Sequence, residues 1–113
     1  MSPITTHVLD TARGGPAAGV PITLEILNDD QSWTELSSGT TNADGRVASL
    51  LQPGELKEAT YRITFHTGMY FQRNEIQGFY PEVPVLFTIT DTTEHYHVPL
   101  LISPFGFSTY RGS

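Results

Sequence analysis

Residues 95–113 read HYHVPLLISPFGFSTYRGS and begin with a pattern typical of a half-buried β-strand. Successive side chains of a strand point to opposite faces, so His95 and His97 share one face. The other face is apolar enough to belong to a core and carries Tyr96, Val98, Leu100 and Ile102. The pattern therefore predicts a strand that presents imidazoles on one side and is anchored in a hydrophobic interior on the other.

The last four residues combine a phenol, a guanidinium, a glycine and a hydroxyl beside the terminal carboxylate. They are Tyr110, Arg111, Gly112 and Ser113. Chain ends are commonly frayed. This one follows a dense aromatic and apolar run with no polar linker between them. We therefore expect the tail to be docked against the domain.

Alternating apolar and polar side chains predict further short strands in the rest of the chain. The clearest covers residues 20–27, where every second residue is a valine, isoleucine or leucine. Other strands are expected at residues 4–9, 33–38, 46–51, 60–66, 83–89 and 106–110, with a hairpin at 91–94 leading into the histidine strand.

One helix is expected at residues 69–77, capped by Thr67 and ended by Gly78. Seven or eight short strands and one helix predict a single all-β domain over residues 1–113, an antiparallel β-sandwich.

Composition excludes several classes of function. The chain of 113 residues has a net charge of −6, and its six basic residues are scattered. Binding to nucleic acid or to an anionic membrane is therefore not expected. The absence of cysteine excludes disulfides and thiol chemistry. The sequence has no run of apolar residues long enough to span a membrane, and a cytoplasmic location is the expectation.

Histidines and one arginine are the residues best suited to chemistry. A neutral imidazole can take a proton near pH 7, and a guanidinium can stabilise a developing oxyanion or hold a planar anion. His7 lies in the first expected strand, and Arg46 directly follows a turn. Alone, each is more often a structural or solvated residue. Together with His97, they would suit the activation of water.

A zinc site is the alternative that the same histidines leave open. His95 and His97, with a third distant histidine, could supply three imidazoles to a catalytic zinc. This spacing is a weak signal, and no nearby carboxylate completes the set, although Asp91 and Glu94 precede it. We expect a site without metal or cofactor.

Two stretches resemble the signatures of the transthyretin family. Residues 7–10 (HVLD) and 14–17 (GGPA) resemble the N-terminal signature, and residues 96–108 (YHVPLLISPFGFS) resemble the C-terminal one, with Ile102 where leucine is usual. The terminal YRGS resembles the mark of the enzyme branch, which hydrolyses 5-hydroxyisourate. Members of the hormone-carrier branch typically have lysine where His7 stands and threonine where His97 stands, and they lack this tail.

The resemblance implies a transthyretin-like homotetramer with active sites between its dimers. It implies that His7, Arg46 and His97 are catalytic and that 5-hydroxyisourate is the substrate. The residues implied to bind that substrate are His7, Arg46, Tyr110, Arg111, Gly112 and Ser113. His95 is expected to be structural or supporting, and the choice of general base between His7 and His97 stays open.

Overall fold

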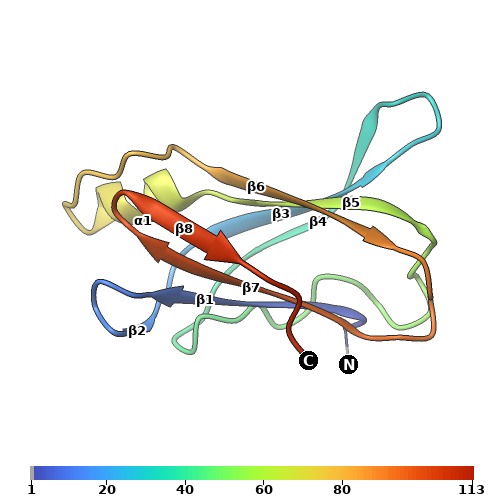
Figure 1. Ribbon diagram of the computed structural model, residues 1–113, viewed down its shortest axis with the longest axis horizontal. Coiled ribbons are helices and arrows are strands. Elements are labelled where there is room, and N and C mark those ends of the chain that lie inside the picture. Colours follow the sequence, from blue (N-terminus) through green and yellow to red (C-terminus); the bar gives the residue numbers. More distant parts are fainter. Residues whose placement is uncertain (1) are drawn as a thin grey trace.

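Two four-stranded β-sheets face each other in the computed structural model, which describes residues 2–113 (Figure 1). The first sheet has the order β2-β1-β7-β8, with β1 at Ile4–Asp10, β2 at Gly15–Pro16, β7 at Tyr96–Ser103 and β8 at Gly106–Thr109. The second has the order β4-β3-β5-β6, with β3 at Pro21–Leu27, β4 at Trp33–Thr40, β5 at Ala59–Phe65 and β6 at Val83–Ile89. The predicted β-sandwich with one short helix is confirmed.

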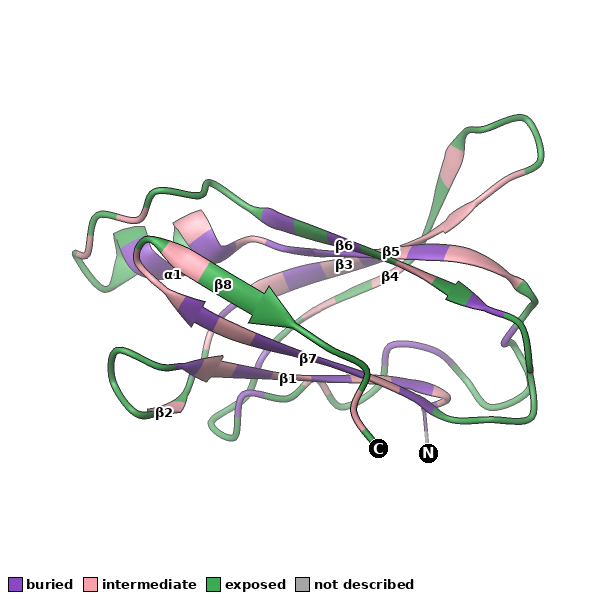
Figure 2. Cartoon of the chain, viewed as in Figure 1, coloured by how far each residue is buried: buried purple, intermediate pink, exposed green. Residues whose placement is uncertain are grey.

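The core lies between the sheets and is built from the alternating residues of the strands. Ile22 and Leu24 of β3 and Ile63 of β5 are fully or almost fully buried, and Val8 and Leu100 face them from the first sheet. Figure 2 shows buried segments alternating with more exposed ones along β1 and β7. Each such side chain contributes roughly 1.5–3 kcal/mol on burial. This burial fixes which residues of β1 and β7 face outward.

The pairing of β1 with β7 is parallel, running from Ile4 opposite Tyr96 to Asp10 opposite Ile102. All other strand pairs are antiparallel. The expected hairpin at residues 91–94 was wrong, because β6 and β7 belong to different sheets and this segment crosses between them. The crossover brings β7 back beside β1 in the same direction.

The strand expected at residues 46–51 is also absent from the described structure. Only Arg46 forms a β-bridge there. Leu50 and Leu51 are both buried, although they are neighbours in sequence. A regular strand would send one of them outward. Burying both requires an irregular segment, which the Ser2 hydroxyl ties to the backbone N–H of Leu51 at 3.1 Å.

The helix α1 spans Thr67–Arg73, shorter and earlier than expected (Figure 1). Thr67 is its first residue rather than its cap, and the Thr67 hydroxyl is buried with no hydrogen-bond partner among residues 2–113. The helix cannot continue past its C-cap residue, Asn74, because Glu75 takes a positive φ of 59°. Gly78 does not cap it but packs against the ring of Phe71.

Candidate functional site

The outward face of the first sheet carries the two histidines that the sequence singled out. In the parallel ladder Thr5 lies opposite His97, and His7 lies opposite Pro99. His7 and His97 are therefore diagonal neighbours on one face, close enough for their side chains to interact. Their sequence neighbours Val8 and Val98 are buried, which anchors both strands from the other side.

A tight turn brings Arg46 beside His7. The Val8 N–H donates to the Gly45 carbonyl at 2.8 Å, and Arg46 forms an isolated antiparallel bridge with His7. Gly45 has a φ of 76°, and a Cβ there would clash with the backbone carbonyl of Val8. Only glycine allows the turn to approach β1 this closely. Asn42 fixes the other side, because its side-chain oxygen accepts from the Arg46 N–H at 3.1 Å.

The C-terminal tail continues from β8 and docks along β7, as expected. The Gly112 N–H donates to the His97 carbonyl at 2.8 Å. A Cβ on Gly112 would lie 2.6 Å from Cδ2 of His97, so the tail backbone lies directly against the imidazole. Arg111 anchors the tail: a guanidinium nitrogen is 3.6 Å from Glu94, and its carbon is 4.5 Å from the centroid of the Tyr96 ring.

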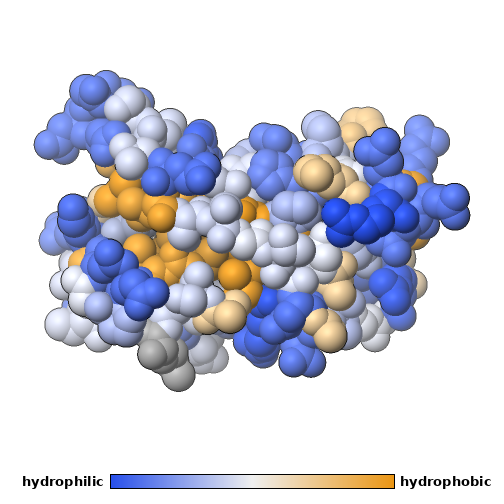
Figure 3. Space-filling view, turned by 180° about the vertical axis from the view of Figure 1, so that it is seen from behind, coloured by the Kyte–Doolittle hydropathy of each residue, from blue (hydrophilic) through white to orange (hydrophobic). Residues whose placement is uncertain are grey.

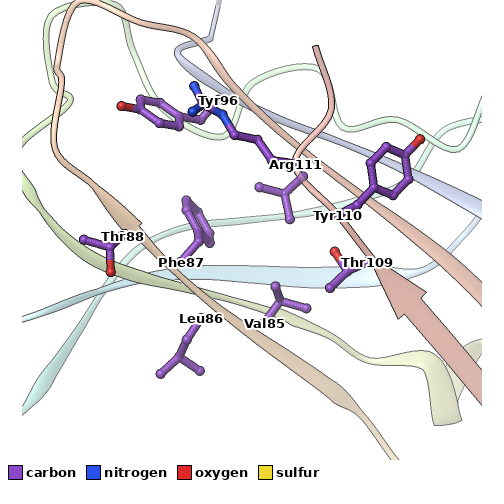
Figure 4. A pocket seen from close by; sticks show the side chains of 9 residues that line it. Val85, Leu86, Phe87, Thr88, Tyr96, Thr109, Tyr110 and Arg111 are labelled. Atoms are coloured by element: carbon purple, nitrogen blue, oxygen red, sulfur yellow. The ribbon is translucent and has the colours of Figure 1, made fainter.

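The tail residues do not all reach the histidines within one chain. Figure 4 shows the Arg111 side chain reaching toward Tyr96, while the Tyr110 ring points away from the apolar side chains. Tyr110 is 59% exposed. One chain thus brings together His7, Arg46, His97 and Gly112. It leaves Tyr110 open to solvent and uses Arg111 as an anchor.

The electrostatics of the cluster favour a neutral His97. Burial lowers the pKa of His97 below its usual value, and the positive charges of Arg46, His95 and His7 lower it further. A hydrogen bond with Thr5 acts in the opposite direction. A neutral imidazole at pH 7 can accept a proton. The guanidinium of Arg46 thus has two effects, since it adds to the lowering of the pKa of His97 by burial and can also attract an anion.

Thr5 is the polar residue of this face that sequence reasoning missed. Its Oγ1 lies 2.8 Å from Nδ1 of His97 and 3.0 Å from Nε2 of His95. A threonine in a strand is an ordinary structural residue. Its place beside His97 depends on pairing between strands about ninety residues apart, which the sequence pattern does not reveal.

Hollows elsewhere on the molecule differ from this cluster in the side chains that line them. A hollow of about 250 Å³ lies where β6 and β8 border the gap between the sheets, lined mostly by apolar residues (Figure 4). On the back of the molecule, apolar side chains are exposed near the projecting end of β3 and β4 (Figure 3). The hollow that Leu36 and Leu51 help to line includes Glu55 and Lys57 but no histidine. Neither of these two hollows contains an imidazole. A third hollow contains both Arg62 and His66, but Arg62 is paired there with Glu25 at 2.8 Å.

Over residues 2–113, no group of three or more histidine, cysteine, aspartate or glutamate side chains is arranged to hold a metal ion. The zinc alternative therefore gains no support from the geometry. In the same part of the chain, no helix has the length and apolarity needed to cross a bilayer.

Comparisons with known proteins place the chain among close relatives. The model of the HIUase/Transthyretin family matches residues 4–112. A protein of Mus musculus named 5-hydroxyisourate hydrolase is 50% identical over 113 residues, covering 99% of this chain and 96% of that protein. One of Deinococcus radiodurans with the same name is 47% identical over 114 residues, covering 97% and 95%.

Solved structures show the same fold. The Klebsiella pneumoniae 5-hydroxyisourate hydrolase superposes with a TM-score of 0.85 at 35% identity, covering 97% of this chain and 92% of that one. Transthyretin from Sparus aurata superposes with a TM-score of 0.94 at 27% identity, covering 99% and 97%. The fold is therefore common to a hydrolase and to transthyretin, and only the side chains of the site can distinguish the two activities.

Proposed function

The chain belongs to the HIUase/Transthyretin family, and we propose that it hydrolyses 5-hydroxyisourate to 2-oxo-4-hydroxy-4-carboxy-5-ureidoimidazoline in urate degradation. One observation carries the proposal: two histidines and an arginine from three separate segments lie on one face, with the tail against one of the histidines. We propose that residues 1–113 form a single domain, because the buried residues of both sheets build one core.

The reaction opens a ring by attack of water on a carbonyl carbon. A bond forms between the water oxygen and that carbon, the ring C–N bond breaks, and the proton lost by water ends on the leaving nitrogen. His97 or His7 takes the proton from water, and the lowered pKa of His97 suits it to this task. Arg46 stabilises the anionic substrate and the negative charge that develops on the carbonyl oxygen.

The tail completes the substrate site. Gly112 lies against the His97 ring, and Arg111 holds the tail in that position. Tyr110 and Ser113 close and orient the pocket. The substrate is small, and no cofactor or metal enters the reaction.

The site is completed by a second copy of the chain. In one chain His7 and His97 are only half-buried and Tyr110 is largely exposed, which leaves room for a second copy and agrees with a homotetramer that has its active sites between dimers. Sedimentation of the protein should show a tetramer, and a stable monomer with full activity would reject the shared site. We place the protein in the cytoplasm, which cell fractionation tests.

A hormone carrier is the second candidate, because a transthyretin solved in complex with thyroxine has the same fold, with a TM-score of 0.93. The two functions are separated by mixing the protein with freshly made 5-hydroxyisourate and following its absorbance. A hydrolase speeds the loss of substrate in proportion to protein concentration. A carrier binds an aromatic ligand tightly and leaves the decay at its uncatalysed rate, and that outcome with folded protein would reject our proposal.

A further inference from the structure

Thr5 of β1 contacts the rings of two histidines that lie outside β1, His95 and His97. It lies on β1 opposite His97 of β7, and its hydroxyl is within hydrogen-bond distance of both His97 and His95. The contact to His97 is to Nδ1, which leaves Nε2 with no hydrogen-bond partner among residues 2–113. The side chain is β-branched and half-buried in a paired strand, so its hydroxyl has little freedom to turn away.

A hydroxyl has a single proton, which restricts what this bridge can do. If Thr5 donates to Nε2 of His95, it must accept from an N–H at Nδ1 of His97. If it donates to Nδ1 of His97, it must accept from an N–H at Nε2 of His95. Whenever the hydroxyl donates to one of the two rings, the rings therefore hold complementary protonation patterns. In the first pattern Nε2 of His97 is unprotonated and can accept a proton from water.

We propose that Thr5 is a positioning residue that sets the tautomer of His97 and connects that ring to His95 as a proton outlet. The proposal deepens the function proposed above and rests on it. Nε2 of His97 accepts a proton from water, while Nδ1 releases its own proton to the Thr5 hydroxyl. That hydroxyl passes its original proton to Nε2 of His95, which holds the positive charge until the relay runs back and Nε2 of His97 gives its proton to the leaving nitrogen. No bond other than N–H and O–H changes in this relay.

The surroundings of the three groups give the relay a direction. Arg46 and His7 face His97 from the turn and from β1, and their positive charges disfavour a second proton on that ring. His95 directly precedes β7 and is exposed to solvent. A charge moved from His97 to His95 therefore goes from a crowded, partly buried position to a hydrated one.

A pair of substitutions at Thr5 isolates the hydroxyl. Thr5→Val keeps the branched shape and removes the hydroxyl, whereas Thr5→Ser keeps the hydroxyl. We expect Thr5→Val to lower kcat about tenfold with KM within about twofold of the unchanged protein, as for the loss of one hydrogen bond to a group that becomes charged. Thr5→Ser should recover most of kcat. Thr60→Val removes a hydroxyl from the other sheet and should leave kcat unchanged.

A double variant tests the connection to His95. If both residues act in one relay, Thr5→Val with His95→Gln should be no slower than the slower single variant. If the kcat losses of the two single variants multiply in the double variant, the two residues act independently and the relay is overturned. An unchanged kcat in Thr5→Val, or an equal loss in Thr5→Ser, would overturn the role of the hydroxyl.

A readout without substrate separates this inference from the proposed activity. Nitrogen chemical shifts of labelled histidines report which ring nitrogen carries the proton. We expect His97 to be protonated at Nδ1 at neutral pH in the unchanged protein and in Thr5→Ser, and to lose this preference in Thr5→Val. The same tautomer distribution in all three proteins would reject the inference even if hydrolysis were established. An enzyme inactive on 5-hydroxyisourate with the expected shifts would reject only the proposed function.

Discussion

Gly112→Ala tests whether the tail holds His97 in place. A Cβ built on Gly112 would lie 2.6 Å from Cδ2 of His97 and 3.3 Å from Cγ of Pro99. Ordinary contacts begin at 3.4 Å, so the tail or the imidazole has to move by about 0.8 Å. The proline ring is fixed to a buried strand position and cannot give way. The displacement therefore falls on the His97 ring or on the tail itself.

The expected cost follows from the sensitivity of catalysis to geometry. A misplacement of about 1 Å can reduce turnover about 10²-fold. We expect kcat/KM to fall by about that factor, equivalent to roughly 2.7 kcal/mol of transition-state stabilisation. The free energy of unfolding should change little, because the tail lies at the chain end and contributes little to the core.

The assay measures initial rates at several concentrations of fresh 5-hydroxyisourate, together with the midpoint of thermal unfolding. Gly106→Ala is the matched control, since a Cβ there would lie 3.6 Å from the Ser103 hydroxyl, an ordinary contact. If Gly112→Ala stays within threefold of the unchanged protein, or if both variants lose the same activity, the tail does not position His97.

Four further predictions concern the pH dependence of catalysis, the pH dependence of stability, a buried hydrogen bond and metal. Because the pKa of His97 is lowered, kcat/KM should fall only as the pH drops below the usual histidine range. Arg46→Gln removes one positive charge that lowers this pKa, so the fall should move to higher pH. A move to lower pH would contradict the role of His97 as the base. Below about pH 6.5, the ordinary value for histidine, His97 takes up a proton more readily in the unfolded chain than in the folded one, because its pKa is lowered in the fold. The free energy of unfolding should therefore decrease as the pH falls below about 6.5. The Tyr70 hydroxyl donates to the buried Asp10 carboxylate at 2.8 Å, so Tyr70→Phe should cost about 1–3 kcal/mol in denaturant unfolding, and an unchanged midpoint would refute this role. Full activity should persist in excess chelator, whereas a loss that zinc restores would revive the zinc alternative.

Much of the fold could be predicted because one face of each strand is buried. β3, β5 and β6 show this directly: Ile22, Ile63 and Val83 each begin or continue a run in which every second residue faces the core. The segment after Arg46 could not be predicted this way, because neighbouring leucines are both buried there. Nor could the parallel pairing of β1 with β7, since local patterns carry no information about which distant strands meet.

The site could be predicted from the sequence less well than the strands. Spacing alone left His7, Arg46 and His97 as three separate weak signals, and only the resemblance to a family joined them. Their common face arises from the β1–β7 register and from the glycine turn before Arg46. Thr5 had no signal of its own, because its importance lies in a hydrogen bond to a strand at the other end of the chain.

The kinetics of three single variants test the proposed active site most directly. His7→Gln, Arg46→Gln and His97→Gln should each keep the fold and lower kcat/KM for 5-hydroxyisourate by about 10²-fold or more. His66→Gln is the control, since His66 lies beside Thr23 and Glu82, outside the cluster, and should retain near-normal activity. Near-normal activity in all three folded variants would show that the reaction takes place elsewhere.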